Sequence, residues 1–177
     1  MDPRPTSDRA WILIGMMGAG KSAVGRSLAE VTGRKFVDTD QLVQRRVCHS
    51  IPNIFRIYGE EAFRSHETAV LKSLRAEPSI VSTGGGIVLR EANWEELRRL
   101  GPIAYLRSSL PNLLHRLQNS QKKRPLLESE DWETRVETIL EARKPLYEQA
   151  DIILDVDDLE IQEAARELAT RFAAWTS

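Results

Sequence analysis

Short runs of apolar residues alternate with longer amphipathic stretches along most of the chain. A short, continuously apolar run is typical of a strand covered on both faces, and we expect five of them: Trp11–Ile14, Lys35–Val37, Ile80–Ser82, Ile103–Leu106 and Ile152–Leu154. The intervening stretches have helical spacing and predict helices at Lys21–Thr32, Glu60–Arg75, Glu91–Leu100, Pro111–Gln118, Trp132–Tyr147 and Leu159–Trp175. Alternating strands and helices predict an α/β fold of three layers, in which helices flank both faces of a parallel sheet.

Composition narrows the class of protein. The 177 residues suit a single domain spanning 1–177, and 25 basic residues balance 26 acidic ones, so no overall basic field favours nucleic acid. The single Cys48 excludes an internal disulfide and fits a reducing compartment. No apolar run approaches a membrane span, and residues 1–9 lack the apolar core of a signal peptide and are typical of a flexible leader. We therefore expect a cytoplasmic protein with no nucleic-acid or membrane partner.

The first predicted strand leads into a glycine-rich segment, Gly15-Met-Met-Gly-Ala-Gly-Lys-Ser22, which fits the pattern G-x-x-x-x-G-K-[ST]. Glycines let the backbone turn its N–H groups toward phosphate oxygens, beside the N-terminus of the next helix. Lys21 would reach the β- and γ-phosphates, and the Ser22 hydroxyl would bind Mg²⁺. The alternative is a glycine turn before an ordinary helix. The pattern predicts a nucleoside triphosphate site formed by Gly18, Ala19, Gly20, Lys21, Ser22 and Ala23.

A metal ion at such a loop needs an acidic residue at the end of a nearby strand. Asp38 and Asp155 both follow predicted strands. We favour Asp38, because ligands of open α/β sheets bind at the carboxyl ends of central strands, whereas the last strand often lies at an edge. Asp38 also suits the N-cap of the helix expected near Gln41, and the two roles are compatible. No Asn-Lys-x-Asp motif is present, which argues against a GTPase switch.

Several further motifs follow in order along the chain. They are Asp38-Thr-Asp40, Gly59-Glu-Glu-Ala-Phe-Arg-Ser-His-Glu67, Ser82-Thr-Gly-Gly-Gly86, Lys123-Arg-Pro-Leu-Leu127 and Arg143-Lys-Pro-Leu-Tyr147. With the glycine-rich segment, this ordered set resembles the shikimate kinases from about Trp11 to Asp155. The resemblance implies transfer of phosphate from ATP to the 3-hydroxyl of shikimate, on the pathway to chorismate and the aromatic amino acids. It also implies a P-loop kinase fold with a five-stranded parallel sheet in the order 2-3-1-4-5.

Two stretches interrupt the alternation of strands and helices. About forty residues between the second and third predicted strands supply no strand, and the polar segment 119–131 has the composition of a surface loop. The resemblance implies that residues about 39–75 form the shikimate-binding segment and residues about 119–131 a mobile lid. Two variable surface loops are the other interpretation of these stretches.

Shikimate is a carboxylate with three hydroxyls, and the motifs supply matching groups. A planar guanidinium binds a carboxylate well, so we assign Arg64 and Arg143 to the acceptor's carboxylate. Asp40 would hold or deprotonate the attacking hydroxyl, and backbone N–H groups of the Gly84, Gly85 and Gly86 turn would approach the acceptor closely. The other interpretations are a surface ion pair between Arg64 and Glu67, a helix C-terminal cation at Arg143, and a mere turn at the glycines.

Two further arginines are assigned to the nucleotide. Arg124 would close over the transferring phosphoryl group, and the resemblance makes Arg116 the nearest match to an arginine that packs on adenine. Glu61 and Glu67 would orient arginines or face solvent. With Mg²⁺ held by Ser22 and Asp38 as cofactor, we expect a monomeric kinase for ATP and shikimate. The alternatives are a related small-molecule kinase, such as gluconate kinase or a nucleoside monophosphate kinase, and a non-catalytic binding protein.

Overall fold

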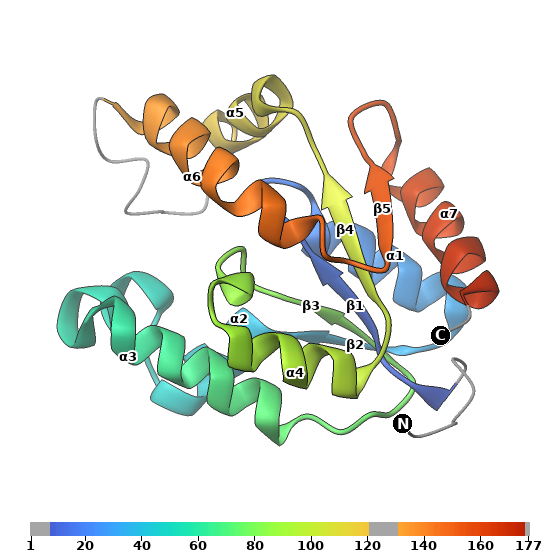
Figure 1. The fold of residues 1–177 in the computed structure, drawn as a ribbon, viewed down its shortest axis with the longest axis horizontal. Helices are drawn as coiled ribbons and strands as arrows, with labels where there is room; N and C mark the ends of the chain where they lie inside the picture. Colours follow the sequence, from blue (N-terminus) through green and yellow to red (C-terminus); the bar gives the residue numbers. More distant parts are fainter. Residues whose placement is uncertain (1–7, 121–130, 176–177) are drawn as a thin grey trace.

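The computed structural model describes residues 8–120 and 131–175. Its five strands form one parallel sheet in the order β2-β3-β1-β4-β5 (Figure 1). The strands are β1 (Trp11–Ile14), β2 (Lys35–Asp38), β3 (Ser79–Ser82), β4 (Ile103–Arg107) and β5 (Ile152–Asp155). The predicted order 2-3-1-4-5 is therefore confirmed, and β1 lies at the centre of the sheet.

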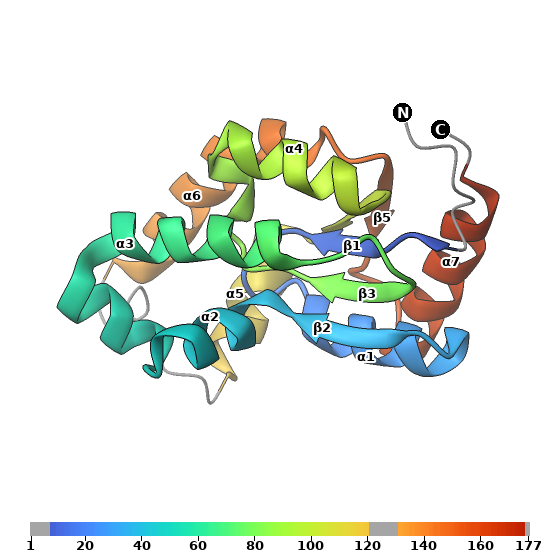
Figure 2. The same cartoon turned by 90° about the horizontal axis from the view of Figure 1, so that it is seen from below.

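Helices cover both faces of this sheet. In chain order they are α1 (Lys21–Thr32), α2 (Thr39–Val47), α3 (Ile51–Ser73), the short 3₁₀ helix η2 (Ile87–Leu89), α4 (Glu91–Leu100), α5 (Leu110–Gln118), α6 (Trp132–Tyr147) and α7 (Ile161–Ala174). Figure 2 shows α1 and α7 on one face and α4 with the end of α3 on the other. The three-layer α/β prediction is confirmed.

The second half of the chain's long strandless stretch is one interrupted helix. The spacing of apolar residues predicted a helix from Glu60, whereas α3 begins at Ile51, and Gly59 breaks its regular geometry with φ 81° and ψ 172°. Ile54 before the break and Phe63 after it pack in a small separate core beside the main one. The predicted start at Glu60 therefore coincides with the second part of α3, after the kink, and the prediction missed the first part, before Gly59.

The main core lies between the sheet and its helices, and the strands that enter it differ in burial. Every residue of β1 is buried, as a continuously apolar strand predicts. No residue of β2 is fully buried, because β2 is an edge strand, so the expectation of cover on both faces is wrong there. Trp11 stacks on Phe172 with ring centroids 4.8 Å apart, which ties β1 to α7.

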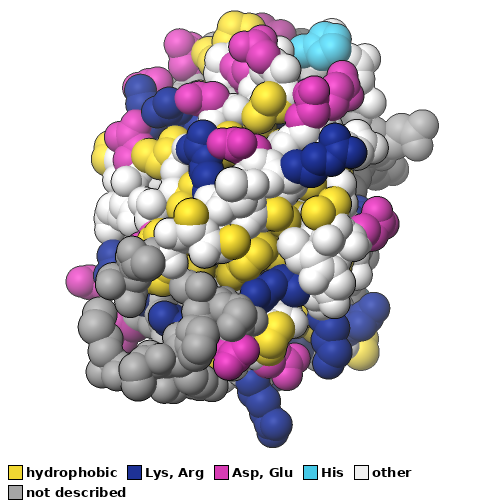
Figure 3. All heavy atoms as spheres, turned by 90° about the vertical axis from the view of Figure 1, so that its right-hand side faces the viewer, with side chains coloured by type: hydrophobic (Ala, Val, Ile, Leu, Met, Phe, Trp, Pro, Cys, Tyr) yellow, Lys and Arg dark blue, Asp and Glu magenta, His cyan; other side chains and the backbone are white. Residues whose placement is uncertain are grey.

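The described surface carries acidic and basic side chains intermingled. On the face drawn in Figure 3, Lys and Arg alternate with Asp and Glu around a central group of hydrophobic side chains. Among the described residues, no helix is long and apolar enough to cross a membrane.

Candidate active site

The turn after β1 curls around a buried lysine. Gly18 and Gly20 have φ angles of 86° and 92°, which strongly favour glycine. Gly20 directly precedes α1, so the positive end of that helix's dipole lies at this loop. The Lys21 Nζ donates hydrogen bonds to the carbonyl oxygens of Gly15 and Met16, at 2.8 and 2.9 Å. The loop thus gathers backbone donors and one ammonium at a helix N-terminus, which is the arrangement that binds phosphate.

A hydroxyl and a carboxylate lie side by side next to this loop. Ser22 Oγ donates to Asp38 Oδ2 at 3.0 Å, while Asp38 Oδ1 accepts from the backbone N–H of Gln41 at 3.2 Å and so caps α2. The two predicted roles of Asp38 therefore use different oxygens. Ser82 Oγ lies 3.5 Å from Ser22 Oγ, at the carboxyl end of β3. Two hard oxygen donors beside a phosphate-binding loop fit Mg²⁺, which takes one or two protein ligands and completes its shell with phosphate and water.

Asp155, the other candidate for the metal, is engaged elsewhere. It ends the edge strand β5, and its carboxylate receives hydrogen bonds from Arg107 at 2.5 and 2.7 Å. This exposed pair holds the pKa of Asp155 below its usual value, because the guanidinium stabilises the charged form. Within residues 8–120 and 131–175, no group of three His, Cys, Asp or Glu side chains could form a metal site by itself. The geometry favours Asp38.

The first glycine after β3 lies between two carboxylates. A Cβ on Gly84 would come within 2.6 Å of Asp40 Oδ1 and 2.9 Å of Glu67 Oε1. The Gly84 N–H donates to Thr39 Oγ1 at 3.3 Å, which joins the turn to the start of α2. A side chain at this position would displace the carboxylates, so only glycine fits. At the glycine turn after β3, the backbone therefore lies close to residues of both α2 and α3.

The third glycine of the same turn packs against Arg64. A Cβ on Gly86 would overlap the guanidinium of Arg64. The Arg64 side chain is nearly buried, and two carboxylates hold it: Nη1 donates to Glu67 at 2.6 Å and Nη2 to Glu60 at 2.9 Å. The interpretation of Arg64 and Glu67 as a surface pair is therefore wrong, because Glu67 is fully buried.

The buried carboxyl of Glu67 has a raised pKa. Burial, with a smaller contribution from the negative charge of Asp40, raises the pKa of its carboxyl to about 7 against the opposing effect of Arg64. Among the described residues, its Oε1 atom has no hydrogen-bond partner. Glu61 is different, because it is exposed and pairs with Arg90. Glu67 thus faces the turn and Asp40 with one oxygen and orients Arg64 with the other.

The middle glycine is bound to the end of α6. The Gly85 carbonyl accepts hydrogen bonds from Arg143 Nη1 at 3.2 Å and from the Tyr147 hydroxyl at 2.5 Å. A Cβ on Gly85 would lie 3.1 Å from the backbone nitrogen of Met17, so the turn also packs on the phosphate-binding loop. The structure therefore brings Arg64 and Arg143 to the same three glycines, from α3 and from α6.

The remaining predicted residues lie on the nucleotide side or outside the described chain. Arg116, on α5, donates to the carbonyl of Ala19 at 3.4 Å and to that of Val156 at 3.2 Å, so it lies between the loop after β1 and the segment after β5. Ala23 is in the first turn of α1. Arg124 and positions 121–130 of the predicted lid lie outside the described residues.

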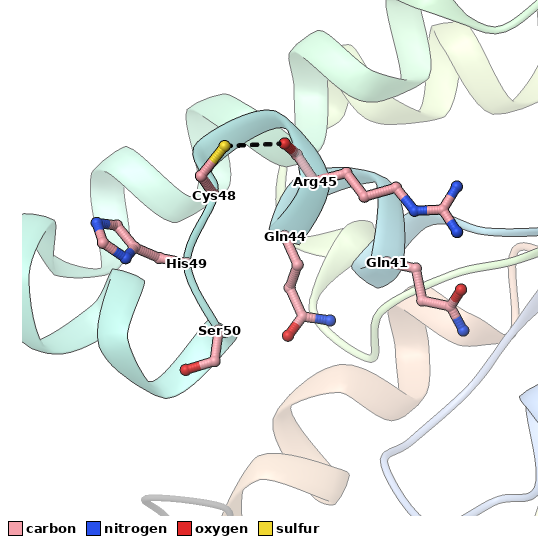
Figure 4. A pocket seen from close by; sticks show the side chains of 6 residues that line it. All are labelled: Gln41, Gln44, Arg45, Cys48, His49 and Ser50. Carbon is pink, nitrogen blue, oxygen red and sulfur yellow. Dashed lines mark hydrogen bonds between the residues drawn. The ribbon is translucent and has the colours of Figure 1, made fainter.

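A surface hollow of about 350 Å³ lies at the junction of α2 and α3. It is lined by Gln41, Gln44, Arg45, Cys48, His49 and Ser50 (Figure 4). None of the predicted site residues lines this hollow. The charged side chains of Arg64, Glu67 and Arg143 lie instead around the glycine turn after β3. We therefore base the candidate site on the loops after β1, β2 and β3.

Comparisons with known proteins agree on one family. A family model described as shikimate kinase matches residues 17–173. The chain belongs to the shikimate kinase family. The shikimate kinase of Xanthomonas campestris pv. campestris (strain 8004) is 43% identical over 98% of this chain and 95% of its own length. A shikimate kinase from Acinetobacter baumannii, solved in complex with shikimate, superposes with a TM-score of 0.89 at 34% identity, covering 96% of this chain and 95% of that one.

Other kinases share the fold at lower identity. A gluconokinase from Sinorhizobium meliloti has a TM-score of 0.66 and 21% identity, over 97% of this chain and 94% of its own. That likeness concerns the fold alone. The chain is thus an enzyme of the shikimate kinase family with the P-loop kinase fold that the motifs predicted.

Two residues that lie at this candidate site, Ser82 and Tyr147, were missed by reasoning from the sequence. Ser82 looks like an ordinary end of a buried strand, and its proximity to Ser22 depends on β3 lying next to β1. Tyr147 closes the motif Arg143-Lys-Pro-Leu-Tyr147, but its apolar spacing indicates only a core position. The motif was the available signal, and we used only its arginine.

Proposed function

We propose that this chain transfers the γ-phosphate of ATP to the 3-hydroxyl of shikimate, with the residue roles set out below. The single observation that supports the acceptor assignment best is the convergence of Arg64 and Arg143 on one glycine turn beside the phosphate-binding loop. Two guanidiniums next to backbone donors favour an acceptor that carries a carboxylate. We treat residues 1–177 as one domain, with the shikimate-binding segment at about 39–75.

The acceptor would bind between the turn after β3 and the start of α2. Its carboxylate would lie on Arg64 and Arg143, and its ring would lie beside Gly84–Gly86, where the absence of side chains lets Asp40, Glu67 and Arg64 pack close to the turn. Asp40, on the first turn of α2, would accept the proton of the attacking hydroxyl or hold that hydroxyl in line. Glu67 would keep Arg64 pointing at the acceptor.

The nucleotide would bind across the loop after β1. Lys21 would exchange its hydrogen bonds to Gly15 and Met16 for phosphate oxygens and would balance the charge of the transferring group. Arg116 would contact the adenine side, and Arg124, on the predicted lid, would add positive charge in the transition state. Mg²⁺, held by Ser22 directly and by Asp38 through water, would supply Lewis-acid stabilisation of the phosphate charge.

The related activity of a gluconate kinase is less well supported. Gluconate also carries a carboxylate, but the fold likeness to the gluconokinase is at only 21% identity, whereas 43% identity links the chain to a shikimate kinase. A cytoplasmic location and a monomeric state are part of the proposal. The availability of ATP and the single, exposed Cys48 support the cytoplasm.

A coupled assay of ADP release tests the proposal. The full chain is given Mg²⁺ and ATP with shikimate, gluconate, quinate or AMP as acceptor, and the phosphorylated position is found by ³¹P NMR. We expect saturable turnover with shikimate alone and a product phosphorylated at the 3-hydroxyl. Turnover on another acceptor would keep the nucleotide site and contradict the roles of Arg64, Arg143 and the glycine turn. Nucleotide binding with no turnover would favour a binding protein.

A further inference from the structure

Tyr147 is the point where three parts of the site meet. It lies in the last turn of α6, is fully buried, and stacks on Tyr105 of β4 with ring centroids 5.0 Å apart. Its hydroxyl donates to the Gly85 carbonyl at 2.5 Å and lies 3.9 Å from Met16 Sδ, in the phosphate-binding loop. A buried tyrosine hydroxyl usually finds a hydrogen-bond partner, and here that partner is the glycine turn that the site is built on.

The same carbonyl is shared with Arg143. Positions 143 and 147 are one helical turn apart on α6, so both side chains reach Gly85 from the same side. A carbonyl oxygen has two lone pairs and can accept both hydrogen bonds. The tyrosine bond, at 2.5 Å, is shorter than the arginine bond at 3.2 Å. Tyr147 and Arg143 therefore satisfy the same carbonyl oxygen together.

Because Arg143 and Tyr147 donate to the same carbonyl, Arg143 can leave Gly85 without leaving that oxygen unpaired. When Arg143 turns toward an anion, it gives up its hydrogen bond to Gly85. A partly buried carbonyl that loses its only donor costs free energy, but here the Tyr147 hydroxyl still satisfies the oxygen. The planar peptide that carries the Gly85 carbonyl also carries the Gly86 N–H, so the same bond fixes the direction of that donor.

We propose that Tyr147 is a positioning residue for the acceptor: its hydroxyl holds the Gly85–Gly86 peptide in place and frees Arg143 to bind the acceptor's carboxylate. This inference rests on the proposed function, because it assumes that the acceptor binds at this turn. Tyr147 itself touches no reacting atom. Its effect is exerted through Gly85 and Arg143.

The test compares two single-atom deletions in the full chain. Tyr147→Phe removes the hydroxyl and keeps the stacked ring, and Tyr105→Phe makes the same change in the stacking partner. Isothermal titration with shikimate gives the dissociation constant, steady-state kinetics give KM for each substrate and kcat, and the melting temperature reports folding. Loss of one net hydrogen bond predicts that shikimate binds to Tyr147→Phe about fivefold more weakly.

The pattern of effects separates positioning from structure. We expect the KM for shikimate to rise about fivefold in Tyr147→Phe, the KM for ATP to stay within about twofold, and Tyr105→Phe to bind shikimate as the wild type does. Unchanged shikimate binding in Tyr147→Phe would overturn the inference. So would an equal rise in both KM values, or an equal loss in Tyr105→Phe, since these indicate general disruption. If the wild type fails to bind shikimate, the proposed function itself is refuted.

Discussion

Replacing Glu67 by Gln removes a buried ionisable group while keeping its shape and its acceptor for Arg64. The pKa of Glu67 is about 7 in the folded chain against an ordinary value of 4.5, because burial penalises the carboxylate more than Arg64 stabilises it. An acid whose pKa is raised by folding binds its proton more tightly in the folded state. The resulting stabilisation is complete below pH 4.5 and is lost as the pH rises through about 7.

The magnitude follows from the two pKa values. The rise in the pKa of Glu67 from 4.5 to about 7 corresponds to about 3 kcal/mol of unfolding free energy over the whole pH range. Most of this change, roughly 2 to 3 kcal/mol, falls between pH 5 and pH 8. Glu67→Gln cannot ionise, so this contribution to the decline between pH 5 and pH 8 should be absent from the variant.

Urea unfolding of the ligand-free protein at several pH values measures the effect. The quantity compared is the change in unfolding free energy from pH 5 to pH 8, because other groups contribute equally to wild type and variant and cancel. Glu60→Gln is the matched control, since Glu60 contacts the same guanidinium but its side chain is 61% exposed. We expect the control to decline with pH as the wild type does, because an exposed carboxylate has little desolvation to lose.

The result that would refute this reasoning is a Glu67→Gln variant whose unfolding free energy declines with pH as steeply as that of the wild type. Glu67 would then be ionised without cost in the folded chain, and Arg64 would outweigh burial. A decline that disappears in Glu60→Gln as well would assign the effect to the guanidinium and not to the buried carboxyl.

Three further predictions concern the nucleotide, the metal and the glycine turn. Lys21→Met should lower kcat at least about 100-fold with an unchanged circular dichroism spectrum, since it removes the cation beside the phosphates; near-normal turnover would contradict its role. Asp38→Asn should raise the Mg²⁺ concentration for half-maximal rate about tenfold, whereas Asp155→Asn should leave it unchanged and alter stability by less than about 1 kcal/mol; equal effects would reverse the metal assignment. Gly86→Ala should raise the KM for shikimate at least about tenfold, because its Cβ would overlap the Arg64 guanidinium, and an unchanged KM would place the acceptor elsewhere.

The local sequence pattern was sufficient to predict β1 and the phosphate-binding loop. The continuously apolar run at β1 predicted a fully buried strand, and Gly15–Ser22 predicted a phosphate-binding loop, because glycine positions and helix starts are determined by neighbouring residues. The strand order was also predicted, although through the family resemblance and not from hydrophobic spacing. The part of α3 before Gly59 was not, since Ile54 there packs in a cluster with Val43 of α2 and Phe63, and the spacing within one segment does not record such contacts between elements.

The sequence by itself determined which chemical groups are present and roughly which loops carry them. Only the tertiary structure decided their environment. The spacing of Arg64 and Glu67 on a helix also fits an exposed pair, and their burial against Gly84 and Gly86 depends on how β3 and α3 pack. The raised pKa of Glu67 and the Gly85 carbonyl shared by Arg143 and Tyr147 have the same origin. Desolvation and hydrogen bonding between segments far apart in the chain arise only when the fold brings them together, so no local pattern records them.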